Sequence, residues 1–289
     1  MDSIVIVGIG LIGGSFAKGL KRLFPESRII GFDKDENNLS EALQLGLIDE
    51  KGTDRTLNSA NMVLLAIPVD ALVNELPKIL DNVSDDCLVL DAGSTKAAIC
   101  QSVENHPKRR NFLACHPIAG TEFSGPSAAF DGLYDGKTNI ICEVEKTAFK
   151  LQEKALELFQ KLGMRIRYMN PEAHDKHIAY VSHLSHISSF MLGKTVIREE
   201  QNERDIFDMA GSGFESTVRL AKSSPDMWTP IFEQNKDNVV KSLEEYIKNL
   251  ESFKQLMEEN DFKGIHDQMN NTNRIKQILK GIPLTKTPK

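Results

Sequence analysis

The feature that most constrains the fold is a glycine pattern near the start of the chain. Gly8, Gly10 and Gly13 follow the spacing G-x-G-x-x-G within IVIVGIGLIGGSFAKGL. An apolar run precedes them and a helix-like stretch follows, as in the first turn of a β-α-β unit. Such glycines permit a tight turn, a close approach of pyrophosphate to the backbone, and close packing of helix against strand. The context predicts a dinucleotide site at the amino end of the helix.

Asp33 indicates which dinucleotide binds. It ends the second strand-like run, 20 residues after Gly13. A carboxylate at this place binds a ribose diol and repels a 2′-phosphate, so NAD is favoured over NADP, and the adjacent Lys34 weakens that preference. A flavin site, or a glycine turn that binds no nucleotide, is the alternative interpretation.

The first half of the chain alternates strand-like and helix-like stretches. Strands are expected at residues 3–8, 28–33, 61–68, 87–93, 111–116, 138–144 and 164–169. These runs are continuously apolar, as in strands that are covered on both faces. The pattern predicts an α/β fold, with a Rossmann-type, doubly wound, mainly parallel sheet in a dinucleotide-binding domain over residues 1–170.

The pattern changes after residue 170, and residues 171–289 show helical periodicity without a convincing strand. We therefore expect an all-α C-terminal domain that contributes to substrate binding and dimerisation. Its long last helix has an apolar stripe at Ile231, Val239, Leu243, Ile247, Leu250, Phe253 and Leu256. In a domain with little core of its own, that stripe predicts a homodimer, the alternative being packing within one chain. The final stretch, GIPLTKTPK, is expected to be a loose polar tail.

Composition narrows the classes of function. The formal net charge is −6, so we expect no nucleic-acid partner and no acidic membrane partner. The N-terminus does not resemble a signal peptide, and no apolar stretch approaches the roughly 20 residues of a membrane span. The cysteines show no zinc-type spacing, and most fall in or beside predicted core strands. Buried free thiols and a cytoplasmic protein are the expectation.

Candidate site residues lie at the carboxyl ends of three predicted strands: Ile67 and Pro68 at the third, Ser94 after the fourth and His116 at the fifth. Ligands of open α/β sheets bind at the carboxyl ends of the strands, so Ser94 and His116 should lie beside the nicotinamide. His116 in LACHPIAGTEFSGP also fits a simple turn, because a proline follows it, and Ser94 in GSTKAAIC also fits a helix cap. The cofactor-binding residues expected besides the glycines and Asp33 are Leu11, Ile12, Ile67, Pro68 and Ser94.

Two stretches of the helical half carry candidate binding residues. In HDKHIAYVSHLSHI, His183 and His186 are three residues apart on one helix face, but no acid or cysteine stands at a supporting spacing, so no metal is expected. In GSGFESTVRLAKSSPDMW, Arg219 and Lys222 lie on one face of a helix. Arginine pairs with carboxylates, and an acidic protein needs such a local cation to bind an anionic substrate. A solvated cationic face is the alternative.

Seven stretches of the chain occur in the order found in prephenate dehydrogenases, enzymes of the tyrosine pathway. They are GIGLIGGS, GFD, LLAIPV, DAGSTK, HPIAGTEFSGP, SHLSHI and RLAKSSPDMW. The chain therefore resembles this family over nearly its whole length, in the single-function form. The resemblance implies that NAD oxidises prephenate with loss of CO2, giving 4-hydroxyphenylpyruvate and NADH.

The resemblance also implies a role for each candidate residue. His116 would take the proton of the ring hydroxyl while hydride leaves the same carbon, and Ser94 would hydrogen-bond both groups. Arg219 would hold a substrate carboxylate. Residues of the substrate pocket or of the loop that gates it would be His183, His186, Thr121 and Glu122.

Glu215 departs from the family, because some relatives carry a lysine at this position. An acid near the pocket suits a substrate that bears an ammonium group, so arogenate is the alternative to prephenate. Three further alternatives are a dehydrogenase that acts on a β-hydroxy acid or an imine, an NAD-binding redox sensor without catalysis, and a helical half that serves only as a dimerisation scaffold, with Arg219 at the subunit interface.

Overall fold

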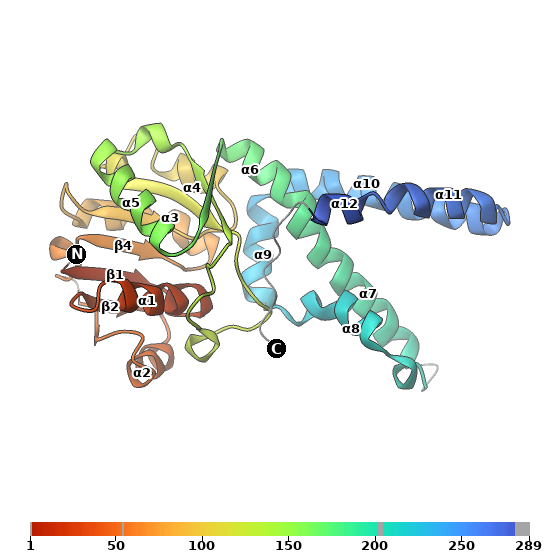
Figure 1. The fold of residues 1–289 in the computed structure, drawn as a ribbon, viewed down its shortest axis with the longest axis horizontal. Coiled ribbons are helices and arrows are strands. Elements are labelled where there is room, and N and C mark those ends of the chain that lie inside the picture. Colours follow the sequence, from red (N-terminus) through yellow and green to blue (C-terminus); the bar gives the residue numbers. More distant parts are fainter. Residues whose placement is uncertain (1, 54, 202–204, 281–289) are drawn as a thin grey trace.

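The computed structural model describes residues 2–53, 55–201 and 205–280. The polar tail expected at residues 281–289 lies outside the described residues. Figure 1 shows a sheet with helices on both faces and, beside it, helical arms that extend away from the sheet.

One eight-stranded sheet has the order β3-β2-β1-β4-β5-β6-β7-β8. Its strands are β1 (Ser3–Val7), β2 (Arg28–Phe32), β3 (Glu50–Lys51), β4 (Met62–Leu65), β5 (Leu88–Asp91), β6 (Phe112–Pro117), β7 (Thr138–Cys142) and β8 (Arg165–Met169). The strands β1 to β6 are parallel, whereas β7 is antiparallel to β6 and parallel to β8. The predicted Rossmann-type, mainly parallel sheet is confirmed, and β3 is the strand that we did not predict.

The helices alternate with the strands up to β8 and then follow one another. They are α1 (Leu11–Leu23), α2 (Glu36–Gln44), α3 (Val69–Asn82), α4 (Ala97–Ser102), α5 (Phe149–Lys161), α6 (Pro171–Ile178), α7 (Leu184–Glu200), α8 (Ser212–Val218), α9 (Pro225–Gln234), α10 (Lys236–Glu258), α11 (Phe262–Thr272) and α12 (Ile275–Lys280). Two short elements also matter for the site: a π-helical turn η5 (Ala179–His183) and a 3-10 turn η7 (Arg219–Lys222).

The sheet has a hydrophobic core on each face, because successive side chains of a strand point to opposite sides. Ile4 and Ile6 of β1 join the cluster that contains residues of α1 and α5. Val5, between them, joins the cluster that contains residues of α3, α4 and α9. All four cysteines are buried free thiols, as predicted. The prediction of full burial is wrong for β8, where Arg165, Arg167 and Tyr168 are exposed, because β8 is an edge strand.

The helical part begins at α6, directly after β8, and the predicted all-α character is confirmed. The long last helix expected around Ile231 to Leu256 is interrupted at Asn235, where α9 ends and α10 begins. Trp228 and Ile231 of α9 pack into the second core cluster of the sheet, so this helix attaches the helical part to the sheet. In the ranges that the structure describes, no helix is long and apolar enough to cross a membrane.

Candidate active site

The glycine turn connects β1 to α1 at the point where the strand order reverses, between β1 and β4. Gly8 has a φ of +91°, and a Cβ added there would lie 2.4 Å from the Ala66 carbonyl oxygen. A Cβ added to Gly13 would lie 2.0 Å from the Gly8 carbonyl oxygen. By contrast, the nearest atom to a Cβ added at Gly10, the N-cap of α1, is 4.0 Å away. Two glycines thus shape the turn, and Gly10 leaves room for a pyrophosphate at the helix end.

Asp33 lies directly after β2, beside this turn. One carboxylate oxygen accepts a hydrogen bond from the Ile9 backbone N–H at 2.9 Å. The other accepts from the Asp35 N–H at 3.0 Å and the Asn38 side chain at 3.2 Å. The carboxylate is therefore held at the rim of the turn, where a ribose diol would lie.

The remaining residues predicted to bind the cofactor flank the same switch point of the sheet. Leu11 and Ile12 form the first turn of α1, and the Ile12 carbonyl accepts a 2.6 Å hydrogen bond from the Tyr134 hydroxyl. Ile67 is half-buried, and Pro68 is the exposed N-cap of α3. Because α1 and α3 follow the neighbouring strands β1 and β4, these four residues lie at the same edge of the sheet, where a ligand of such a fold would bind.

His116 is buried near the end of β6, and its ring contacts a residue of the helical part. His116 Nδ1 lies 2.8 Å from Nε2 of His174, on α6, and His174 Nδ1 lies 2.7 Å from Oδ1 of Asp175. All three side chains are buried. Burial lowers the pKa of His116 well below its ordinary value, and the charges of His174, Lys96 and His183 lower that pKa further. The imidazole is therefore neutral at neutral pH and able to accept a proton.

Asp175 also caps α4, the helix that follows Ser94. Its carboxylate accepts hydrogen bonds from the backbone N–H groups of Lys96, at 2.7 Å, and Ala97, at 2.9 Å. Ser94 itself is half-buried two residues before the N-cap Lys96, so the alternative that Ser94 caps this helix is wrong. Among the described residues, no hydrogen bond joins Ser94 to His116, whose Nδ1 faces His174 instead.

A buried ion pair between Lys96 and Asp91 stabilises the loop that carries Ser94. Lys96 is fully buried, and its ammonium group hydrogen-bonds the Asp91 carboxylate and the Cys115 carbonyl oxygen. Asp91 also accepts from the backbone N–H groups of Gly93, at 2.9 Å, and Cys115, at 2.8 Å. Although burial lowers the pKa of Lys96, Asp91 holds it above its ordinary value. The pair fixes the loop that carries Ser94 against the strand that carries His116.

Arg219 lies in η7 rather than in the helix predicted for it, because α8 ends at Val218. Its guanidinium donates a 2.9 Å hydrogen bond to the carboxylate of Glu122, in the loop after β6. A hydrogen bond from its own backbone N–H and the contact with Arg219 both lower the pKa of Glu122. Thr121 accepts from the Phe123 N–H at 3.3 Å, within the same loop. The hydrogen bond from Arg219 to Glu122 therefore connects η7 to the loop after β6.

Both remaining histidines contact Trp228 of α9. The ring of His186 stacks on Trp228 with a centroid distance of 3.5 Å, and the ring of His183 meets it edge-on at 5.8 Å. Nδ1 of His183 accepts a 3.2 Å hydrogen bond from the Asn235 side chain. Burial lowers the pKa of His183 to about 4, and burial with the charge of Arg219 lowers that of His186. His183, His186 and Trp228 thus form one aromatic cluster in the helical part.

Two family models cover most of the chain. The nucleotide-binding domain of prephenate dehydrogenase matches residues 16–168, and the dimerization domain of prephenate dehydrogenase matches residues 170–271. The chain belongs to the prephenate dehydrogenase family. It is accordingly an oxidoreductase of the group that includes prephenate, arogenate and cyclohexadienyl dehydrogenases.

Individual relatives support this assignment. The prephenate dehydrogenase of Bacillus subtilis is 30% identical over 268 residues, which is 90% of this chain and 71% of that protein. A crystal structure of prephenate dehydrogenase from Aquifex aeolicus, in complex with hydroxyphenyl propionate and NAD+, is 35% identical with a TM-score of 0.84, covering 96% of this chain and 98% of that one. Synechocystis arogenate dehydrogenase is 26% identical with a TM-score of 0.76, covering 96% and 99%.

His174 and Asp175 adjoin His116 and are not among the residues predicted from the sequence. His174 is one of four histidines in HDKHIAYVSHLSHI. The one signal available was that an acid directly follows a histidine at the start of a helix, which does not indicate that this pair meets His116, 58 residues away. Among the described residues, no group of three or more His, Cys, Asp or Glu side chains could hold a metal ion.

The lowered pKa values of the buried histidines predict a loss of stability in mild acid. The unfolded chain protonates these histidines near pH 6.5, whereas the folded chain keeps His116, His174, His183 and His186 neutral at lower pH. The unfolded state therefore binds more protons, and each such histidine lowers the free energy of unfolding as the pH falls below 6.5, by at most about 1.4 kcal/mol per pH unit. Thermal melting between pH 6.5 and 5 measures this slope.

A matched pair of variants tests whether the buried histidines cause this dependence of stability on pH. His183→Gln should flatten it, and His177→Gln, on an exposed site of α6, should not change it. A melting temperature that is constant from pH 6.5 to 5 would contradict the burial of neutral histidines.

Proposed function

We propose that this chain oxidatively decarboxylates prephenate to 4-hydroxyphenylpyruvate with NAD as the oxidant. The observation that carries the proposal is the neutral, buried imidazole of His116 at the carboxyl end of β6, in the sheet whose glycine turn suits a dinucleotide. Asp33 beside that turn favours NAD over NADP. The Aquifex aeolicus relative was solved with NAD+ and hydroxyphenyl propionate, an acid with a hydroxyphenyl ring like that of the proposed product.

The chain's own residues supply a base and a cation. NAD, when bound, accepts a hydride from the ring carbon that bears the hydroxyl group. His116 accepts the hydroxyl proton in the same step, for which an imidazole that is neutral at the working pH is suited. The carbon–carbon bond to the ring carboxylate then breaks and CO2 leaves. The electron pair of this bond makes the ring aromatic, and the ring oxygen takes back the proton from His116. Arg219 binds a substrate carboxylate, and its bond to Glu122 holds the loop after β6 over the site.

The surroundings of Glu215 favour prephenate over arogenate. Glu215 is exposed, and its carboxylate lies 3.9 Å from the ammonium group of Lys222. An acid that already faces a cation offers little to a substrate ammonium group. Arogenate is the second candidate, because the Synechocystis relative is an arogenate dehydrogenase.

A comparison of the two substrates tests this assignment. With purified protein and NAD, we expect kcat/KM for prephenate to exceed that for arogenate by roughly 10-fold or more, because Glu122 and Glu215 already face Arg219 and Lys222 rather than a substrate ammonium group. A higher kcat/KM for arogenate would overturn the substrate and keep the chemistry of His116. NADP in place of NAD is expected to give lower kcat/KM, because Asp33 repels its 2′-phosphate.

Arg219→Gln is predicted to raise the KM for prephenate. Loss of a charged hydrogen bond to a carboxylate costs about 1.5–3 kcal/mol, which corresponds to an increase of roughly 10- to 100-fold in KM with a smaller effect on kcat. Steady-state kinetics on the purified variant measures both constants. Arg167→Gln, at an exposed arginine of the edge strand β8, is the matched control and should change KM little. A normal KM in Arg219→Gln would remove this residue from the pocket.

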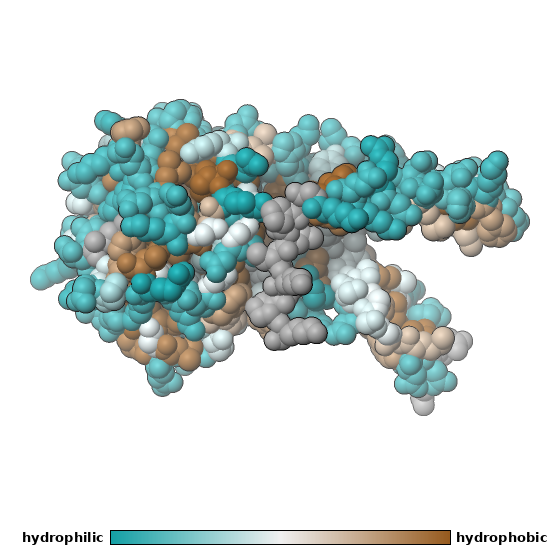
Figure 2. All heavy atoms as spheres, in the orientation of Figure 1, coloured by the Kyte–Doolittle hydropathy of each residue, from teal (hydrophilic) through white to brown (hydrophobic). Residues whose placement is uncertain are grey.

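We also propose that the chain is a homodimer, with a nucleotide-binding domain at residues 1–170 and a helical domain at residues 171–289 that provides the interface. Ser189 is the one buried residue of α7, and Val239 and Ser242 are the buried residues of α10. Two helical arms extend from the sheet, one with α7 and α8 and the other with α10 and α11. Figure 2 shows hydrophobic side chains exposed along both arms. They include Met191, Ile197, Ile247, Leu250, Phe253, Met257 and Phe262.

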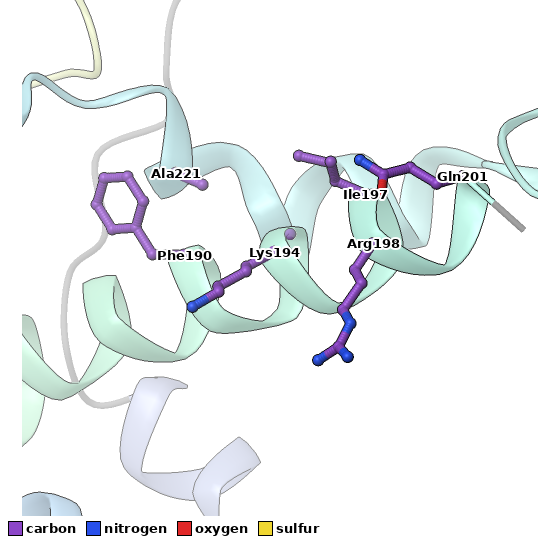
Figure 3. A pocket seen from close by; sticks show the side chains of 7 residues that line it. Phe190, Lys194, Ile197, Arg198, Gln201 and Ala221 are labelled. Carbon is purple, nitrogen blue, oxygen red and sulfur yellow. The ribbon is translucent and has the colours of Figure 1, made fainter.

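The arms also contain a groove suited to an apolar partner. Figure 3 shows this groove on α7, where Phe190 and Ile197 lie near Ala221 of η7. The family model of this segment describes a dimerization domain. Sedimentation should give a particle of twice the 32.3 kDa chain mass, and a monomer at micromolar concentration would contradict the proposal.

A further inference from the structure

A base that accepts a proton through Nε2 must keep that nitrogen unprotonated, and the contacts of His116 specify this tautomer. We propose that Asp175 and His174 are positioning residues that hold His116 with its proton on Nδ1 and its lone pair on Nε2. The inference deepens the proposed function, since it rests on that function for the role of His116 as the base.

Both carboxylate oxygens of Asp175 accept hydrogen bonds from backbone N–H groups. Oδ1 accepts from the Lys96 N–H at 2.7 Å, and Oδ2 accepts from the Ala97 N–H at 2.9 Å. These donors are backbone groups with fixed protons, so the carboxylate is present as an acceptor. His174 Nδ1, 2.7 Å from Oδ1, must therefore be the donor of their hydrogen bond.

The direction of the hydrogen bond between His174 and Asp175 fixes the direction of the one between His174 and His116. Burial lowers the pKa of His174, although Asp175 opposes the shift, so the ring is neutral and carries one proton. Because that proton is on Nδ1, Nε2 of His174 has a lone pair and can only accept. His116 Nδ1, 2.8 Å away, must donate to it. The second nitrogen of His116 is then the unprotonated one, as in other catalytic histidines whose tautomer a buried acid sets.

Asp175 is the acid that sets the direction of these hydrogen bonds, because the other charged groups nearby have partners of their own. Lys96 is close to both histidines, but its ammonium group is bound to Asp91. His183 is neutral and is hydrogen-bonded to Asn235, whose side chain also donates to the Asp175 carbonyl at 2.7 Å. The two rings are buried and meet at an angle of 68° with centroids 5.0 Å apart, so neither can turn without moving the other.

The arrangement also couples the two parts of the chain. His116 belongs to the sheet, whereas His174 and Asp175 belong to the first helix after it, and Asp175 caps the sheet-side helix α4. The correct tautomer of the base therefore forms only when α6 is docked against β6 and α4.

Nitrogen NMR of the histidine side chains tests the tautomer without any substrate. In wild-type protein labelled with ¹⁵N-histidine, both His116 and His174 are expected to show a protonated Nδ1 and an unprotonated Nε2 at pH 7.5. Spectra of His116→Asn and His174→Gln assign the signals by their loss. A protonated Nε2 on His116 in the wild type would overturn the inference.

Kinetics of two His174 variants separates positioning from packing. His174→Phe keeps a ring but offers no acceptor, so kcat is expected to fall on the order of 10²-fold, as when a catalytic histidine is held in the wrong tautomer. His174→Gln offers a carbonyl oxygen to His116 Nδ1 and should recover about 10-fold of that loss. His177→Gln, exposed on the same helix, should match the wild type.

The outcomes are distinguishable. Equal kcat values for the Phe and Gln variants would contradict a role through the tautomer. If His174→Phe does not fold, the tautomer of His116 in the wild-type spectrum alone confirms or refutes the inference. Wild-type protein that shows the expected tautomer but oxidises neither prephenate nor arogenate would refute the proposed function and leave this inference standing.

Discussion

Replacing His116 with asparagine is expected to lower kcat for prephenate on the order of 10²-fold or more, because the reaction loses its proton acceptor. Asparagine is smaller than histidine and uncharged, like the neutral imidazole that it replaces, so the fold and the glycine turn should persist. NAD affinity is expected to change little, since His116 is not among the predicted contacts of the cofactor, which come from the turn after β1, Asp33, Ile67, Pro68 and Ser94. Steady-state kinetics and NAD titration by calorimetry measure the two properties.

The control for this variant is His177→Asn, which changes an exposed histidine of α6 and should retain full activity. A His116→Asn protein that keeps its kcat within a few-fold of the wild type would return His116 to the alternative of a simple turn residue. A loss of NAD binding would instead show that the substitution damages the sheet.

Lys96→Met is expected to destabilise the protein by about 3–5 kcal/mol, because it removes the cation from a buried pair and leaves the Asp91 carboxylate uncompensated. Both side chains have no exposed area, so water cannot replace the lost partner. Urea unfolding followed by circular dichroism measures the change in the free energy of unfolding. The double variant Asp91→Asn/Lys96→Met should be more stable than Lys96→Met alone, since it removes the unpaired charge.

An exposed ion pair provides the control. Lys150 lies 3.6 Å from Asp86 with both side chains more than four-fifths exposed, and Lys150→Met should hardly change stability. A Lys96→Met protein that is as stable as the wild type would mean that the Asp91 carboxylate takes up a proton at little cost.

Features that depend on local pattern could be predicted from the sequence. The continuous apolar runs gave the strands because a strand covered on both faces is apolar at every position, as Ile4, Val5 and Ile6 are. The glycine turn could be predicted because Gly8 and Gly13 occupy places that admit no Cβ. The error at β8 could have been avoided from local pattern, because Arg165 and Arg167 alternate with Ile166, as in a strand with one exposed face.

Features that depend on docking could not be predicted. The helical pattern continues through Asn235, yet the helix breaks there, where the buried side chain of Asn235 bonds the Asp175 carbonyl and His183. The partners of His116 and Arg219 lie 58 and 97 residues away in the chain, and no spacing in the sequence connects them. The sequence thus indicates which residue types are available for chemistry. The packing of α6 against β6 and the contact of η7 with the loop after β6 decide their partners.

The central claim is that the His116 site couples oxidation of a ring hydroxyl to loss of CO2. The most direct test follows NADH, CO2 and 4-hydroxyphenylpyruvate together when purified protein is mixed with prephenate and NAD. We predict that the three products form in equal amounts with wild-type protein, at a rate that collapses in His116→Asn. Failure to form NADH from prephenate, or NADH formation without the aromatic product, would contradict the account.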